Sequence, residues 1–169
     1  LAHGETPTSK QFGNTVRKAI KWLASRKHDV KPVHGYGHAI KAYALAEAYA
    51  MTGITLLEGP MNSAIEIIIK GQQKGGSYHY NYNKNQGEKQ DLSFAGWNYQ
   101  ALKAAYGAGC EVNGLEGASR RSVSWLKKQA DGSKQGKGFP YNAAKSPTGN
   151  KHTMRAVGVL CMQLFGEGK

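Results

Sequence analysis

Apolar positions divide the chain into two kinds of helical segment. In the first kind, apolar residues recur at i, i+3, i+4 and i+7 and charged residues fill the opposite side, which is typical of an amphipathic surface helix. Residues 14–27, 60–71 and 115–129 follow this pattern. In the second kind, nearly every position is apolar or small, so we expect the helix to be surrounded by protein. Residues 39–51, 91–109 and 154–165 are of this second kind.

Local signals place several of the helix starts. Asn14 is expected to cap the first helix, and Pro60 is a suitable first residue for the third. Asp91 is expected to cap the fourth helix, and Ser93 shares this role. The two long polar segments, 72–90 and 131–150, are predicted to be loops.

The two kinds of helix alternate, and the pair repeats roughly every 50–60 residues, a period typical of stacked supersecondary units. Matching positions support the repeat in both kinds of helix, and we expect Trp22 and Trp125 to pack between helices. The matches are Trp22-Leu23-x-x-Arg26, Ile68-Ile69-x-x-Gln72 and Trp125-Leu126-x-x-Gln129 in the amphipathic helices, and Ala44-Leu45-x-x-Ala48, Ala101-Leu102-x-x-Ala105 and, more weakly, Val159-Leu160 in the buried ones.

This alternation predicts an all-α protein. The architecture expected is an α/α toroid, in the form of a partial barrel of about three helical hairpins with buried inner and amphipathic outer helices. Residues 1–169 would form one such partial domain, because 169 residues suffice for one sizeable core. Because the chain begins at Leu1 rather than Met, we expect it to be part of a longer protein, and its localisation stays unassigned.

The net charge of +12 points to an acidic partner, which includes nucleic acid, anionic lipid and phosphorylated ligands. The basic residues are spread over several helices and loops rather than interleaved with aromatic residues, so nucleic acid is disfavoured. Cys110 and Cys161 lie on or beside apolar helices and are expected to be buried thiols, with a disulfide left open. No apolar run is long enough to span a membrane, and we recognise no signal peptide.

Three motifs resemble the repeat of prenyltransferases and of squalene and terpene cyclases. In that family an outer helix ends in Gln, followed by glycines and an aromatic residue. The motifs are Gln72-Gln73-Lys-Gly75-Gly76-Ser-Tyr78, the looser Gln129 followed by Gly138-Phe139-Pro-Tyr141, and the inner-helix signature Asp91-x-Ser93-x-x-Gly96-Trp97-x-x-x-Ala101-Leu102.

The likeness is closest to uncharacterised bacterial proteins with prenyltransferase and squalene oxidase repeats, and it covers nearly the whole chain. It rests on strings that recur in the same order: Tyr36-Gly-His38, Ala46-Glu47-Ala48-Tyr49, Gly96-Trp97 and Ala156-Val-Gly158-Val-Leu160-Cys161. A complete toroid of the family would have about twice as many hairpins as this chain supplies.

The resemblance implies a ligand cavity near the N-terminal ends of the inner helices. Helix N-termini present free N–H groups and a positive dipole end, so they favour an anion. The candidate ligand-binding residues at these ends are His34, Tyr36, His38, Tyr78, Asp91, Ser93, Trp97, His152 and Arg155.

Asp91 is the single candidate for a catalytic role, as a general acid, and helix capping is the alternative. The related cyclases protonate an alkene with the motif D-x-D-D, whereas this chain has Gln90-Asp91-Leu-Ser93, with one carboxylate. The pattern therefore argues against cyclase chemistry, and the chain is more typical of a protein that is not an enzyme.

His34 and His38 have the spacing of metal ligands on a helix, but Gly35 and Gly37 argue against a regular helix there. We assign no metal and no cofactor. His152 and Arg155 could hold a phosphate or form a solvent-facing helix start. Alternate tyrosines at 78, 80 and 82 would point the same way in an extended segment, either to stack on a ligand or to lay the loop over the helix ends.

Three functions are compatible with these features. The first is a non-catalytic binding or scaffold module that recognises a protein, an isoprenoid-like ligand or an anionic ligand. The second is an isoprenoid-handling enzyme, similar to a cyclase or a transferase. The third is a binder of anionic polymers or membrane surfaces, driven by the net charge. An open arc is also expected to pair with another copy through its inner face.

Overall fold

The computed structural model describes residues 3–25, 35–87, 91–131, 138, 139, 141 and 151–167. Within these residues all regular secondary structure is helical, apart from an isolated bridge between Gln72 and Tyr78. The elements are α1 (Gly13–Ser25), α2 (Gly35–Thr52), the short 3-10 helix η2 (Thr55–Leu57), α3 (Glu58–Gly71), α4 (Leu92–Gly107), α5 (Leu115–Asp131) and α6 (Lys151–Leu164). The prediction of an all-α protein is confirmed.

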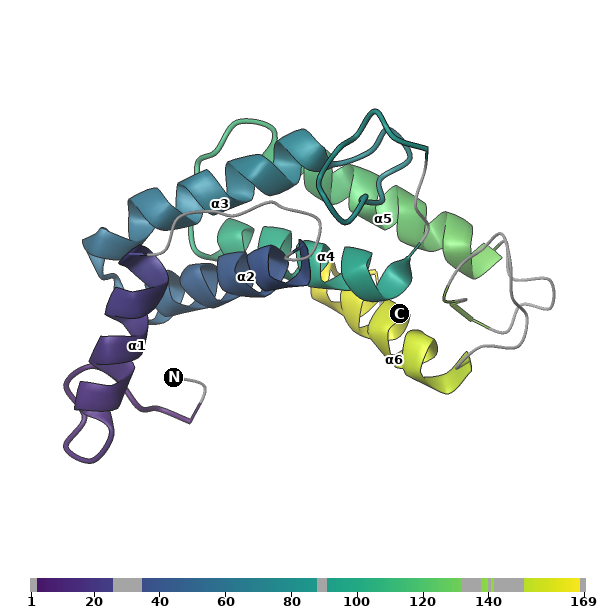
Figure 1. The fold of residues 1–169 in the computed structure, drawn as a ribbon. Coiled ribbons are helices and arrows are strands. Elements are labelled where there is room, and N and C mark those ends of the chain that lie inside the picture. The colour runs from purple at the N-terminus through teal and green to yellow at the C-terminus, as the bar shows by residue number, and fades with distance from the viewer. Residues whose placement is uncertain are drawn as a thin grey trace.

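The helices form two layers that bend into an arc (Figure 1). One layer is a row in which α4 lies between α2 and α6. The other consists of α3 and α5, which pack against each other and against the row. Helix α1 packs on α2 and η2 at one end of the arc. The helices predicted to be inner and those predicted to be outer thus lie in different layers, with α1 tilted at the edge.

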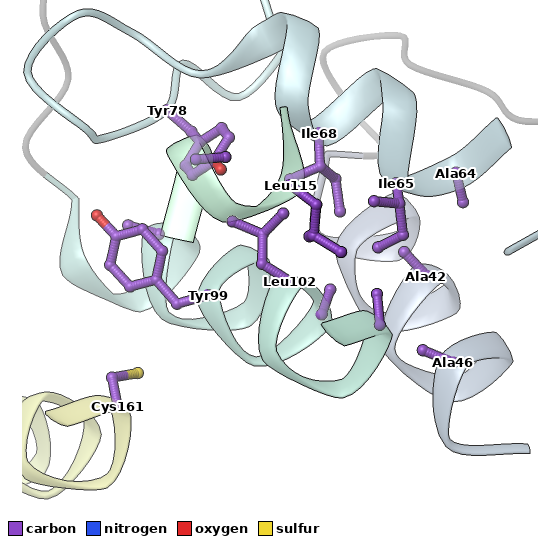
Figure 2. Close-up of a cluster of buried hydrophobic side chains, with 14 of the residues drawn as sticks. Ala42, Ala46, Ala64, Ile65, Ile68, Tyr78, Tyr99, Leu102, Leu115 and Cys161 are labelled. Carbon is purple, nitrogen blue, oxygen red and sulfur yellow. The ribbon is translucent and has the colours of Figure 1, made fainter. Parts of the chain in front are cut away.

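Helix α4 is the element around which the others are arranged. It contacts α2, α3, α5 and α6, and nine of its sixteen residues are buried. Figure 2 shows Leu102 of α4 among Ile65 and Ile68 of α3 and Leu115 of α5. Each such fully buried side chain stabilises the fold by about 1.5–3 kcal/mol. The prediction that this segment is enclosed on nearly every side is confirmed.

Helices α2 and α6 are less enclosed than their apolar sequences predict. Ile40 of α2 is 41% exposed, and Met51, Val159 and Leu160 also have large exposed fractions. The reason is the order of the row: α4 has a neighbour on each side, whereas α2 and α6 each have α4 on one side. Among the described residues no helix is long and apolar enough to cross a membrane.

The two tryptophans at matching outer-helix positions differ. Trp125 is 3% exposed and packs against Tyr99, as predicted. Trp22 is 55% exposed, so the prediction that it packs between helices is wrong. Helix α1 instead turns its Ile20 side toward the core, which leaves Trp22 on the far side.

Two predicted helix starts are also wrong. Asn14 lies inside α1, because the backbone N–H of Gly13 already bonds to the carbonyl of Ser9 and starts the helical turn one residue earlier. Helix α3 begins at Glu58, directly after η2, so Pro60 is its third residue. Cys110 and Cys161 are both free thiols; Cys161 is buried as predicted and Cys110 is half-buried.

Candidate functional site

Asp91 is the N-cap of α4, as predicted. Its backbone is extended, with φ −85° and ψ 102°, so its side chain can fold back over the first helical turn. The carboxylate atom Oδ1 accepts a hydrogen bond from the backbone N–H of Phe94 at 3.1 Å and another from the hydroxyl of Ser93 at 2.7 Å. One oxygen of Asp91 is therefore fully used in capping.

The other oxygen, Oδ2, binds two tyrosines from distant parts of the chain. It accepts a hydrogen bond from the hydroxyl of Tyr80 and one from the hydroxyl of Tyr141, the latter at 3.0 Å. The hydroxyl of Tyr36, from the first turn of α2, lies 2.6 Å from Ser93 Oγ. We call these five residues, Tyr36, Tyr80, Asp91, Ser93 and Tyr141, the Asp91 cluster.

The Asp91 carboxylate is nearly buried, with 4% of its residue surface exposed. None of the ion pairs among the described residues involves it, so hydroxyl and amide donors surround it instead of cations. Burial, and then the hydrogen bond to Asp91, raise the pKa of Tyr80 well above its ordinary value. Burial also raises the pKa of Tyr36, against a lowering effect of the bond to Ser93. These phenols therefore stay protonated at neutral pH, and Tyr80 keeps its donor to Asp91.

This arrangement is that of a structural tie. Four donors occupy the two carboxylate oxygens, which fills the positions through which the group would meet a substrate. The bonds hold together the N-terminus of α4, the loop that carries Tyr80 and the segment of Tyr141, whose carbonyl also accepts a bond from Leu92 N at 3.3 Å. At the surface, the cluster presents Tyr36 and Tyr141.

Tyr78 and His38 point away from this cluster. Tyr78 is completely buried, and its ring contacts those of Tyr82, Phe94 and Tyr99. His38 is also buried; its Nε2 lies 3.0 Å from the carbonyl oxygen of Ala64 on α3, and its ring packs on Tyr82. Both side chains thus belong to the packing between the layers.

The tyrosine loop is not a regular extended segment. Tyr82 has a φ of 56°, in the left-handed region, and its hydroxyl bonds to Asn98 at 2.8 Å. Tyr78 and Tyr82 are consequently buried and only Tyr80 reaches the cluster. The loop is laid over the helix ends, which was one of the two predicted alternatives.

The remaining candidates are dispersed. Trp97 lies one turn further along α4, with its ring centre 6.3 Å from that of Tyr43. Arg155, on the first turns of α6, lies against Gly138. His34 lies outside the described residues, as does the side chain of His152. Among the described residues, no group of three His, Cys, Asp or Glu side chains is placed to hold a metal ion.

One face of the α2–α4 pair forms a half-exposed aromatic surface. On α2 it consists of Tyr36, Ile40, Tyr43 and Glu47, which follow helical spacing, and on α4 of Ser93 and Trp97. We call these six residues the inner face. The hydroxyl of Tyr43 donates to Glu47 Oε1 at 2.5 Å, and this bond, with burial, raises the pKa of Tyr43 to about 12.

No sequence motif pointed to Tyr141 or Tyr43 as site residues. Tyr141 is fifty positions from Asp91 in the chain, so no local pattern joins them. Tyr43 and Glu47 have i, i+4 spacing, which is a local signal for a helical pair.

A separate cavity of about 290 Å³ lies at the other end of α4. Its charges are Lys103, Glu116, Arg120 and Glu167. Arg120 already pairs with Glu116 at 2.8 Å, and Glu167 pairs with Lys127 at 2.7 Å. The cavity therefore offers little uncompensated charge to a ligand.

No protein-family model matches the chain, and no curated protein or solved structure matches it either.

Proposed function

We propose that this chain is a non-catalytic binding module of the α/α-toroid type, which holds its ligand or partner on the inner face. The observation that carries the proposal is the pairing of two features on α4. The single candidate acid is saturated by four hydrogen-bond donors, while the aromatic surface beside it is half-exposed.

The toroid part of the proposal is supported by the layering of the helices. Buried α4 is flanked by α2 and α6 in one layer, and amphipathic α3 and α5 pack on the outside (Figure 1). Successive inner–outer pairs that curve in one direction are what an arc of such a toroid requires. The sequence resemblance described above points the same way.

The binding part is supported by the chemistry of the inner face. Tyr36 and Ile40 are 37% and 41% exposed, and Trp97 and Tyr43 lie close by. Aromatic side chains with polar tips bind apolar chains and flat groups while their hydroxyls satisfy polar atoms. The N-termini of α2 and α4 meet at the edge of this face, where an anionic group would be favoured.

An isoprenoid-handling enzyme would need Asp91 to deliver or accept a proton at the substrate. To do so, Asp91 would have to give up the bond to Tyr80 or that to Tyr141 and become accessible from a 4% exposed position. The observed geometry opposes that change, because the same bonds hold three segments together.

The test is a calorimetric titration of the chain with a long-chain prenyl diphosphate at low and high salt, followed by product analysis of the same mixture. We expect saturable binding without product, weakened by Trp97→Ala and by Ile40→Ala. Leu56→Ala, which removes a 60% exposed side chain from η2, should bind like the parent chain.

Three results would count against the proposal. Product that disappears in Asp91→Asn would establish an enzyme. Binding that high salt abolishes equally in every variant would leave only attraction by the net charge of +12. Absence of binding in the parent chain would exclude prenyl ligands from the inner face and leave a protein partner as the occupant to test.

A further inference from the structure

The starting observation is the contact between two successive outer helices. Gln72, just after α3, places its Nε2 3.1 Å from both the carbonyl oxygen of Ala118 and the hydroxyl of Ser122 on α5. Its Oε1 accepts a hydrogen bond from Arg121 Nε at 2.8 Å. The amide of one outer helix end is thus satisfied by the next outer helix.

Gly76 completes this contact. It has a φ of +102°, and a Cβ atom there would lie 2.3 Å from the carbonyl oxygen of Arg121 and 2.9 Å from Cβ of Trp125. The turn of residues 72–76 therefore lies directly on α5. We call the positions that receive it, Ala118, Arg121, Ser122 and Trp125, the receiving face of α5.

Helix α1 carries the same set of side-chain types at the same spacing. With Trp22 aligned on Trp125, Lys18 corresponds to Arg121 and Ala19 to Ser122. All three α1 residues are exposed, Trp22 by 55%. The receiving face of α1 thus has a tryptophan, a cation four residues before it and a small residue three before it, and the described residues place no turn upon it.

The other half of the contact is found at the end of α5. Gln129 corresponds to Gln72 in the repeat, and it is just as buried, at 6% exposed. Its Oε1 is buried without a hydrogen-bond partner in the described structure, whereas Oε1 of Gln72 has Arg121. A buried amide oxygen without a donor is unfavourable, so this position calls for a cation of the kind that α1 carries.

We propose that a second copy of this chain binds head to tail, with the Gln129 end of α5 in one copy placed on the receiving face of α1 in the next. In this contact Lys18 donates to Oε1 of Gln129 as Arg121 donates to Gln72, and Trp22 becomes buried as Trp125 is. The occupant is a second copy because one chain holds both complementary halves, and Figure 1 shows α1 and the end of α5 at opposite ends of the arc. The inference does not depend on what the inner face binds.

Head-to-tail contacts close into a ring when the curvature of the subunit allows it. The arc shape of the helix layers supplies curvature in one direction (Figure 1). The net charge of +12 opposes the approach of two copies, so association should increase with salt as this repulsion is screened. An ordinary surface ion-pair contact would show the opposite salt dependence.

The test is sedimentation velocity of the whole chain over a range of concentrations, at low and high salt. We expect concentration-dependent association that strengthens with salt and that Trp22→Ala reduces at least tenfold. Tyr106→Ala is the matched control, since it removes an aromatic side chain of similar exposure, 59%, from α4. Its association should equal that of the parent chain.

Mixing variants tests the head-to-tail geometry. Trp22→Ala damages only the α1 half and Gln129→Lys only the α5 half, so each alone should stay monomeric while their mixture forms dimers through one intact contact. Circular dichroism checks that Gln129→Lys is folded; if it is not, Lys18→Glu with Gln129→Leu replaces the pair. A monomer under every condition, association that Trp22→Ala does not change, or failure of the mixture to associate would each overturn the proposal.

Discussion

Two loops are tied to the helix layers by polar side chains, and they are tied in different ways. The turn of residues 72–78 is held by a neutral amide, Gln72, deep between α3 and α5. The loop that carries Tyr80 is held by a carboxylate, Asp91, at the end of α4. The first tie allows almost no change of shape, whereas the second leaves Tyr36 and Tyr141 partly exposed.

The comparison separates a packing device from a surface that can meet a ligand. Around Gln72 every neighbour is close enough that a single added carbon would collide with backbone. Around Asp91 the donors are phenols whose rings border the inner face. We therefore expect changes at the first tie to act on stability alone, and changes at the second to act on stability and on binding.

The largest effect is expected from Gly76→Ala. The new Cβ would lie 2.3 Å from the carbonyl oxygen of Arg121, and the φ of +102° disfavours any side chain. Together these should lower the free energy of unfolding by more than about 3 kcal/mol. Gly87→Ala is the control, because nothing lies within 4 Å of its Cβ position. Urea unfolding measures both, and equal stability of the two variants would show that the turn can move away from α5.

Asp91→Ala should have the next largest effect. It removes the cap of α4 and leaves the hydroxyls of Tyr80 and Tyr141 without their acceptor, which together should cost about 2 kcal/mol. Asp91→Asn keeps an oxygen for the cap and should cost about half as much. Urea unfolding and amide exchange at Phe94 check this. A gain in stability would contradict it, and would mark Asp91 as a functional group held in an unfavourable place.

Alkaline pH should weaken both regions through their tyrosines. Burial raises the pKa of Tyr78 and of Tyr99 well above the ordinary 10.0, and burial with the bond to Asp91 raises that of Tyr80. These raised values contribute stability that is complete below pH 10 and is lost as pH rises above it, because the unfolded chain then releases protons that the folded chain retains.

Each buried tyrosine should steepen this loss by about 1.4 kcal/mol per pH unit. Urea unfolding at several pH values above 10 measures the slope. Tyr78→Phe should make the slope shallower by one proton, while Tyr106→Phe, at an exposed position, should leave it unchanged. A slope that is the same in all three chains would mean that Tyr78 is not retained as a neutral phenol.

How far the sequence could anticipate these regions depends on whether the signal is local. The helices and their two layers follow from the spacing of apolar residues, and the cap at Asp91 follows from its place before such a run. The exposure of Trp22 could not be read in this way, since the same motif is buried at Trp125. What differs is the turn that packs on the helix, which comes from elsewhere in the chain.

The Asp91 cluster has the same limit. Tyr141 reaches Asp91 from fifty residues away, and alternation of the loop tyrosines fails where Tyr82 turns into the left-handed region. A spacing rule describes neighbours within one element, so it cannot report which distant hydroxyl completes a buried carboxylate.

The smallest expected effect distinguishes two buried tyrosines beside the Gln72 turn. The rings of Tyr78 and Tyr99 contact each other and both are fully buried. The hydroxyl of Tyr99 donates to the carbonyl of Gly76 at 3.0 Å, whereas that of Tyr78 is buried without a hydrogen-bond partner in the described structure. Removing each hydroxyl therefore measures what one hydrogen bond contributes in one environment.

Tyr99→Phe should destabilise the chain by about 1 kcal/mol, because a made bond is lost while Gln72 still satisfies Gly76. Tyr78→Phe should be neutral, or stabilise by up to about 1 kcal/mol, because it removes a buried hydroxyl that has no partner. Urea unfolding of both variants at neutral pH gives the difference. If Tyr78→Phe were the more damaging of the two, its hydroxyl would have a partner, and the Gln72 turn would be held by one more polar contact than the amide and Tyr99 provide.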